Sequence, residues 1–486
     1  MAETDLGQMS GPLTGNKRTA YFFQPEICNY YFGAGHPMKP IRLKLTHSLL
    51  VGYGLLPTLD VYRSHLASHE ELAAFHTDDY TSFLNRINPT NAEELAEQCS
   101  TFQVGNFTDC PAFEGVWGYC QMLAGGSIDG AVRLNAGDAD VAINWSGGMH
   151  HAKKNEASGF CYVNDIVLGI LELLKVHQRV LYIDIDIHHG DGVEEAFYTT
   201  DRVMTCSFHK YGNFFPGTGD VKEQGHGPGK GYSVNFPLQE GITDEAYHSV
   251  YKPVIARIME TYRPGAVVMC CGADSLAGDR LGCFNLTLDG HAECIKYAKS
   301  FGLPTLVLGG GGYTPRNVAR CWAHETGVLL GQTMDDLLPE SPLREYFRPS
   351  YKLRLGVLDD LDNQNSHDYL HKNLEEVMEQ LRQLPGAPSV PFQNVPPALL
   401  PGRASAGGTG AAGSAAETVD PDTRDLAAEV DAKAHAGEHY DVSAAAAATA
   451  LADSGSVVKL WDGSQEAGGE DVEQLQVQAA SGAGDA

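Results

Sequence analysis

Residues 179–192 of the chain read RVLYIDIDIHHGDG. The first nine of them form a short apolar run rich in β-branched residues, which is typical of a buried β-strand. Four similar runs occur at residues 140–144, 203–207, 266–270 and 304–308. Apolar residues at helical spacing occur at residues 164–177, 245–262 and 291–301. This alternation predicts an α/β domain with a mostly parallel β-sheet flanked by helices.

The composition of the whole chain bounds the size of this domain. Of its 486 residues 43% are hydrophobic and 20% are charged, which excludes a wholly disordered, collagen-like or coiled-coil chain. Residues 391–486 contain 24 alanines, 12 glycines, and 15 acidic against 4 basic residues. We therefore predict a flexible N-terminus over 1–17, one large domain over 18–384, and a disordered, acidic, Ala/Gly-rich tail over 385–486. Within that tail, VVKLW at 457–461 is either a short binding motif or part of an unselected segment.

Charge and cysteine content limit the partners and the compartment. The 62 acidic and 34 basic residues give a net charge of −28, which argues against direct DNA binding and favours a basic partner. No apolar run reaches the ~18 residues of a membrane span, and the N-terminus lacks the pattern of a signal peptide. The 11 cysteines include no CxxC pair, which indicates reduced thiols. We expect a soluble intracellular protein.

Polar or glycine-rich residues follow every predicted strand. These segments are GGMHH at 147–151, HHGDG at 188–192, FHKY at 208–211, GADS at 272–275 and GGGGY at 309–313. In open α/β sheets, ligands bind outside the carboxyl ends of the strands. The sequence therefore predicts a functional site at this edge of the sheet.

The strand at 179–187 carries acidic residues that need a cation. Asp184, Asp186 and His188 alternate with isoleucines, so period-two geometry places them on one face. Two buried carboxylates side by side are costly unless a positive charge compensates them. We predict that Asp186, His188 and Asp274 share a metal ion, Zn²⁺ or, by ligand type, Fe²⁺. An Asp-x-His pair alone is more often a satisfied core group, but a second His pair, a third carboxylate and a glycine turn ending in Tyr favour a site. His189 lies on the opposite face and is expected to be structural.

At these residues the chain resembles the class I histone deacetylases, which are zinc-dependent lysine deacetylases of the arginase-like fold. The likeness spans about residues 21–384. It rests on GHPMKP at 35–40, GMHHAKK at 148–154, ASGFCYVND at 157–165, residues 183–197, FHKYG at 208–212, FPGTGD at 215–220, GDRLGCFN at 278–285 and residues 309–320. Ile41 stands where the family usually has His, and the tail lacks the Lys/Glu-rich composition of familiar members.

The resemblance implies metal-assisted hydrolysis of N6-acetyl-lysine on histone tails to lysine and acetate, in transcriptional repression. It makes Asp186, His188 and Asp274 the zinc ligands. It implies an acid/base pair, His150 and His151, held by Asp184 and Asp191 respectively. Tyr313 would hydrogen-bond the scissile carbonyl oxygen, with a flexible turn at 309–312 that lets the phenol move.

Further sites and partners are implied by the same resemblance. The acetyl-lysine tunnel, its rim and an internal acetate-release pocket would use Gly159, Phe160, Phe215, Leu281, Asp109 and Arg42. A K⁺ site would use Asp184, Asp186, His188, Ser207 and Phe208. An inositol phosphate pocket would use Tyr31, Gly35, Lys39, Arg280 and Arg316. The expected partners are acetylated histone tails and corepressor subunits, in the nucleus and secondarily in the cytoplasm.

Two other functions fit parts of the sequence. A non-catalytic scaffold would keep the fold for partner binding, but every implied ligand, both histidines and Tyr313 are present. A small-molecule amidohydrolase acting on acetylated polyamines would share the fold, but the long match around residues 279–285 disfavours it.

Overall fold

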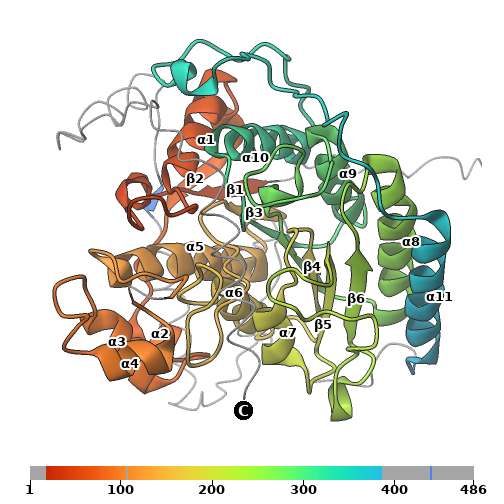
Figure 1. Ribbon diagram of the computed structural model, residues 1–486, viewed down its shortest axis with the longest axis horizontal. Coiled ribbons are helices and arrows are strands. Elements are labelled where there is room, and N and C mark those ends of the chain that lie inside the picture. The colour runs from red at the N-terminus through yellow and green to blue at the C-terminus, as the bar shows by residue number, and fades with distance from the viewer. Residues whose placement is uncertain (1–17, 106–107, 386–437, 440–486) are drawn as a thin grey trace, which may run out of the picture.

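Eight parallel strands and one short antiparallel strand form a single sheet in the computed structural model, which describes residues 18–105, 108–385 and 438–439. The strand order is β6-β5-β4-β7-β8-β3-β1-β2-β9 (Figure 1). The strands are β1 Thr19–Phe22, β2 Asp60–Arg63, β3 Val141–Asn144, β4 Val180–Asp184, β5 Val203–Lys210, β6 Ser233–Leu238, β7 Ala266–Cys270, β8 Thr305–Leu308 and β9 Glu438–His439. The predicted α/β fold with a mostly parallel sheet is confirmed.

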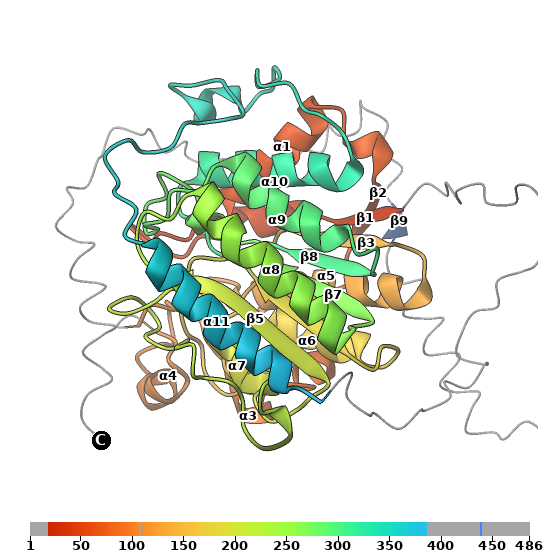
Figure 2. The ribbon, with the colours of Figure 1, turned by 90° about the vertical axis from the view of Figure 1, so that its right-hand side faces the viewer.

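Helices cover both faces of the sheet (Figures 1 and 2). They are α1 Ile41–Gly52, α2 His69–Leu72, α3 Asp78–Arg86, α4 Ala96–Phe102, α5 Val116–Ala136, α6 Asp165–Leu173, α7 Asp191–Phe197, α8 Asp244–Tyr262, α9 Leu288–Lys299, α10 Pro315–Leu330 and α11 His367–Gln383. α5, α6 and α7 lie on one face, and α1, α10, α9 and α8 follow one another across the other. α11 packs outside α8.

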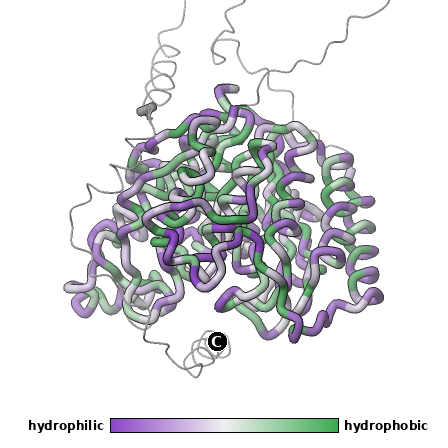
Figure 3. Tube along the Cα trace, turned by 90° about the horizontal axis from the view of Figure 1, so that it is seen from above, coloured by the Kyte–Doolittle hydropathy of each residue, from purple (hydrophilic) through white to green (hydrophobic). Residues whose placement is uncertain are grey.

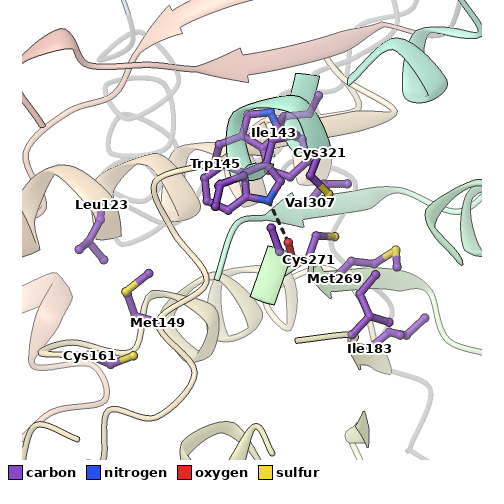
Figure 4. Close-up of a cluster of buried hydrophobic side chains, with 14 of the residues drawn as sticks. Leu123, Ile143, Trp145, Met149, Cys161, Ile183, Met269, Cys271, Val307 and Cys321 are labelled. Carbon is purple, nitrogen blue, oxygen red and sulfur yellow. Dashed lines mark hydrogen bonds between the residues drawn. The ribbon is translucent and has the colours of Figure 1, made fainter. Parts of the chain in front are cut away.

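Alternate residues of the central strands β4, β7, β8 and β3 belong to two separate hydrophobic clusters. In β4, Val180 and Tyr182 pack with α6, while Leu181 and Ile183 pack with α8 and α9. This is the period-two arrangement expected of a strand that is buried on both faces. Part of the larger cluster surrounds Trp145, Val307 and Cys271 (Figure 4). Hydrophilic segments dominate the outer turns of the molecule (Figure 3). Because side chains pack on both of its faces, the sheet is a rigid base for the residues at its carboxyl edge.

Several expectations from the sequence differ from the structure in detail. The run at 179–187 is a strand only to Asp184, whereas the run at 203–207 continues to Lys210. β1, β2 and β6 were not predicted. The predicted N-terminal segment 1–17 and most of the predicted tail, including 457–461, lie outside the described residues. Residues 438–439 of that tail pair with β2.

The cysteine and membrane expectations can be compared directly. None of the 11 cysteines forms a disulfide, and all but Cys283 are buried. Among the residues that the structure describes, no helix has the length and apolar composition needed to cross a membrane.

Gly125 in the middle of α5 permits a close backbone approach that predicts a stability effect. A Cβ at this position would lie 2.0 Å from the carbonyl oxygen of His65. Because a backbone atom cannot swing aside, we expect Gly125→Ala to lower the free energy of unfolding by about 3 kcal/mol or more in denaturant titration. Gly169→Ala in α6 is the control, since its nearest atom is a Leu306 side-chain carbon at 3.1 Å and its expected change is below about 1 kcal/mol. Equal losses in the two variants would contradict this account.

Candidate metal centre and catalytic site

The segment that leaves β4 turns by side-chain hydrogen bonds instead of continuing as a strand. Asp184 Oδ1 accepts the amide of Asp186 at 3.0 Å, and Asp186 Oδ1 accepts the amide of His188 at 2.9 Å. Each carboxylate thus takes the N–H two residues ahead, as in an Asx turn. The predicted strand ends early for this reason. Asp186 and His188 are nevertheless brought together, and both are buried.

Asp186, His188 and Asp274 place their ligand atoms within 4.8 Å of one another. His188 Nδ1 lies 3.1 Å from Asp186 Oδ1 and 3.1 Å from Asp274 Oδ2. The other oxygen of each carboxylate is held by a backbone amide, Gly311 at 2.7 Å to Asp186 and Ile187 at 3.0 Å to Asp274. Outer partners of this kind orient metal ligands.

The charges at this centre call for a cation. Burial and the negative charge of Asp186 raise the pKa of Asp274. Burial also acts to raise the pKa of Asp186, but the positive charges of His150 and His188 outweigh it and lower that pKa. Two fully buried carboxylates and one imidazole nitrogen are the donor set of an open Zn²⁺ site, so the residues present fit that ion.

Two other groups of side chains in the described part of the chain have metal-like spacing. One is His150, Asp186 and Cys270, and the other is His291, Cys321 and Glu325. Burial and the nearby acidic residues raise the pKa of the Cys270 thiol, which disfavours the thiolate that a metal needs. His291 already bonds Glu325 and, at 3.0 Å, the carbonyl oxygen of Gly272. The set at Asp186, His188 and Asp274 is therefore the better candidate.

Two adjacent imidazoles lie beside the ligand set, each on its own carboxylate. His150 Nδ1 donates to Asp184 Oδ2 at 2.8 Å, and His151 Nδ1 donates to Asp191 Oδ1 at 2.7 Å. The ring centroids are 3.9 Å apart. These bonds fix the tautomer of each ring and leave Nε2 for proton exchange. The family resemblance assigned Asp184 to His150 and Asp191 to His151, and the structure contains both of these contacts.

The two imidazoles have opposite proton affinities. Burial lowers the pKa of His150, but the charges of Asp184 and Asp186 more than compensate and raise it to about 9. Burial and the neighbouring charge of His150 lower the pKa of His151 to about 3. Titratable neighbours whose pKa values are driven apart are typical of an acid and a base working together.

The glycine turn before Tyr313 is held from several sides. Arg42 donates to the carbonyl oxygens of Gly310 at 2.6 Å and Gly312 at 2.9 Å, and the amide of Ala273 donates to Gly311 at 3.0 Å. A Cβ at Gly311 would lie 2.0 Å from Asp274 Oδ2, so glycine serves close packing there. The expected flexibility of this turn stays a prediction, although bonds to the carbonyl oxygens of Gly310, Gly311 and Gly312 hold it in this conformation. Burial raises the pKa of the Tyr313 phenol well above its usual value, which keeps the phenol a donor.

Comparison with known proteins identifies the family of the chain. A family model described as the histone deacetylase domain matches residues 36–329. The chain is 57% identical over 388 residues to histone deacetylase 19 of Arabidopsis thaliana, covering 80% of this chain and 77% of that protein. It is 56% identical over 380 residues to histone deacetylase 1 of Homo sapiens, covering 78% of each. The chain belongs to the histone deacetylase family. The predicted resemblance is confirmed.

Residues predicted for the tunnel of this histone deacetylase family member contact residues of the candidate site. The ring of Phe215 lies edge-on to His151 at 4.9 Å, and the ring of Phe160 lies edge-on to Tyr313 at 5.7 Å. A Cβ at Gly159 would lie 2.4 Å from the His151 ring. Asp109 Oδ2 accepts the amide of Gly159 at 2.8 Å, which ties the predicted rim residue to the tunnel segment.

The structure shows contacts among several residues of the predicted K⁺ and inositol phosphate sites. Asp184 is in register with Ser207 on the neighbouring strand, so the predicted K⁺ residues meet at the ends of β4 and β5. Lys39 Nζ lies 5.7 Å from the centroid of the Tyr31 ring, and burial together with the charge of Arg280 lowers the Lys39 pKa. Arg316 lies at the start of α10, and its backbone carbonyl oxygen accepts a hydrogen bond from Arg320.

Several residues that support this histone deacetylase site were not found from the sequence. Asp165 accepts the amides of Gly148 at 3.0 Å and Met149 at 2.9 Å, and so holds the turn that leads to His150. The ring of Phe214 stacks on His188 at 5.1 Å. Lys153 Nζ lies 2.6 Å from Asp191. The run of polar residues after each strand was a signal for the site, but not for these individual contacts.

Proposed function

We propose that the chain is a zinc-dependent lysine deacetylase that hydrolyses N6-acetyl-lysine on histone tails, with Asp186, His188 and Asp274 as the zinc ligands. The observation that carries this proposal is the meeting of these three ligand atoms within 4.8 Å, beside two imidazoles on separate carboxylates. Membership of the histone deacetylase family supports the substrate class.

The acid/base work is divided between the two imidazoles in this proposal. A bound zinc ion would supply a Lewis acid that polarises the acetyl carbonyl and acidifies water. His151, whose pKa is lowered, accepts a proton from the attacking water at Nε2. His150, whose pKa is raised, donates a proton from Nε2 to the departing lysine amine. Asp184 and Asp191 keep both rings oriented during these transfers.

Tyr313 and the tunnel residues bind the acetyl-lysine in the proposed reaction. The Tyr313 phenol donates a hydrogen bond to the carbonyl oxygen as negative charge develops on it. An apolar passage between Phe160 and Phe215 accepts the uncharged acetylated side chain and disfavours a bare ammonium. The remaining proposed contacts are Gly159 and Leu281 along the tunnel and Asp109 at its rim.

The family resemblance also supports proposals for further ligands and partners. Arg42, nearly fully buried over the Trp322 ring at 4.9 Å, is proposed to line an acetate-release pocket. The carboxylate of Asp184 and the ends of β4 and β5 are proposed to hold K⁺. Tyr31, Gly35, Lys39, Arg280 and Arg316 are proposed to bind an inositol phosphate, with support from the contact of Lys39 with the Tyr31 ring and the nearby charge of Arg280. We also propose assembly with corepressor subunits, a nuclear location, and the domain division at residues 18–384.

Substrate class can be tested by two parallel rate measurements. Acetate release from an acetylated histone H4 peptide is expected to exceed release from acetylspermidine by at least about 10-fold in kcat/KM, because remote peptide contacts add binding energy in the transition state. Comparable rates would point to a small-molecule amidohydrolase. No release from either substrate by the zinc-loaded chain would leave the scaffold function in its place.

A further inference from the structure

The carboxylate of Asp279 gathers four backbone amides from two separate segments. Oδ1 accepts the amides of Leu281 at 2.9 Å and Gly282 at 3.1 Å. Oδ2 accepts the amides of Tyr313 at 2.7 Å and Thr314 at 3.2 Å. A carboxylate offers about four acceptor sites, so this side chain is fully engaged.

The two segments that Asp279 joins carry two proposed active-site groups. Leu281 belongs to the tunnel wall, and Tyr313 supplies the phenol. Gly312, just before Tyr313, has φ +125°, a conformation in which other residues are strained. Its carbonyl oxygen is fixed by Arg42, and the Tyr313 amide is fixed by Asp279. The Asp279 bond is thus the last backbone restraint before the phenol.

We propose that Asp279 is a positioning residue, which sets the Tyr313 phenol against the tunnel wall at Leu281. It holds both segments with one rigid group, one oxygen for each. Charge-assisted bonds of this kind are about twice as strong as neutral ones. Loss of either oxygen frees one segment relative to the other. This inference rests on the proposed function for its kinetic readout only.

A merely structural role has to be separated from positioning. Thr314 is the N-cap of α10 and has no side-chain cap bond, so the Asp279 carboxylate also satisfies the start of that helix. Asp244 provides the matched control. It accepts the amide of Thr287, the N-cap of α9, at 2.9 Å. Asp244→Asn therefore removes a carboxylate that holds the start of a helix outside the proposed site.

The first measurement compares Asp279→Asn with Asp244→Asn. Asn keeps one acceptor oxygen and turns an NH₂ donor toward two backbone N–H groups, so one segment must move. We expect Asp279→Asn to lower kcat by about 100-fold with KM changed by less than about 3-fold and zinc content unchanged. Asp244→Asn is expected to stay within about 3-fold in kcat. Equal effects of the two variants on kcat would overturn the proposal.

The second measurement is a double-mutant cycle with Tyr313→Phe. If Asp279 acts through Tyr313, the double variant is expected to lie within about 3-fold of Tyr313→Phe alone, whereas additive losses would overturn the proposal. If Asp279→Asn does not fold, Asp279→Glu carries the same cycle, since it keeps both oxygens but shifts them by one methylene.

Amide hydrogen exchange gives a readout that does not depend on turnover. Asp279→Asn is expected to speed exchange in residues 311–316 at least about 10-fold and to leave residues 287–291 unchanged, while Asp244→Asn does the reverse. Unchanged exchange at 311–316 would overturn the positioning role. A wild-type chain that fails to hydrolyse any acetyl-lysine peptide would defeat the proposed function, and exchange would still decide the role of Asp279.

Discussion

Asp186→Asn is expected to lose most bound zinc and nearly all acetyl-lysine turnover. The substitution keeps the shape of the side chain but removes one of the two negative charges that face His188. It also places the NH₂ donor either against the Gly311 amide or in the ligand set, facing His188. Loss of an outer partner costs 10- to 100-fold in metal affinity or activity, so losing a ligand should lower kcat/KM by about 10³-fold or more.

The measurement is metal content by atomic emission together with initial rates on an acetylated peptide. Asp129→Asn is the control, because Asp129 is also a buried carboxylate but accepts the amide and Nδ1–H of His65, outside the proposed site. It should keep normal zinc and turnover. A chelator is expected to abolish wild-type activity, and added Zn²⁺ to restore it. Normal zinc and full activity in Asp186→Asn would overturn the ligand assignment.

The ligand set could be predicted because it depends on residue identity and strand ends. Two carboxylates at alternate positions of a buried strand, followed by a histidine two residues later, are costly to bury unless a cation compensates their charge. This cost can be inferred from the sequence itself. The position where β4 ends was not visible in it. Asp184 and Asp186 accept backbone amides and so end the strand. The side-chain oxygens compete here with the backbone hydrogen bonds between strands, and the pattern of apolar residues does not reveal this competition.

The supporting contacts could not be predicted, because they join a side chain to a distant backbone. Asp165 accepts the amides of Gly148 and Met149, which are 17 and 16 residues away in the sequence. Asp279 accepts the amide of Tyr313, which is 34 residues away. Every residue except proline presents a backbone N–H, so the identity of the partner carries almost no signal. β2 escaped prediction for a different reason, since it is only half-buried and begins and ends with a charged residue, which interrupts the apolar pattern.

His151→Ala is expected to lower kcat by about 10²- to 10⁴-fold while zinc content stays normal, since His151 is the proposed proton acceptor and not a ligand. The variant should fold, because Lys153 still pairs with Asp191 and no charge is left alone. His47→Gln is the control, as it removes another imidazole whose pKa burial lowers to about 4, stacked on Phe23 outside the proposed site. Rates and metal content are measured as for Asp186→Asn.

The two variants together separate binding of the metal from proton transfer. Asp186→Asn should lose zinc and turnover together, whereas His151→Ala should lose turnover alone. Because the ring of His151 lies 5.7 Å from that of His188, a shared role in metal binding is a real alternative. If His151→Ala lost zinc in proportion to activity, His151 would belong to the ligand set, and the acid/base pair would have to be assigned again. Turnover within about 3-fold of wild type would remove His151 from the mechanism altogether.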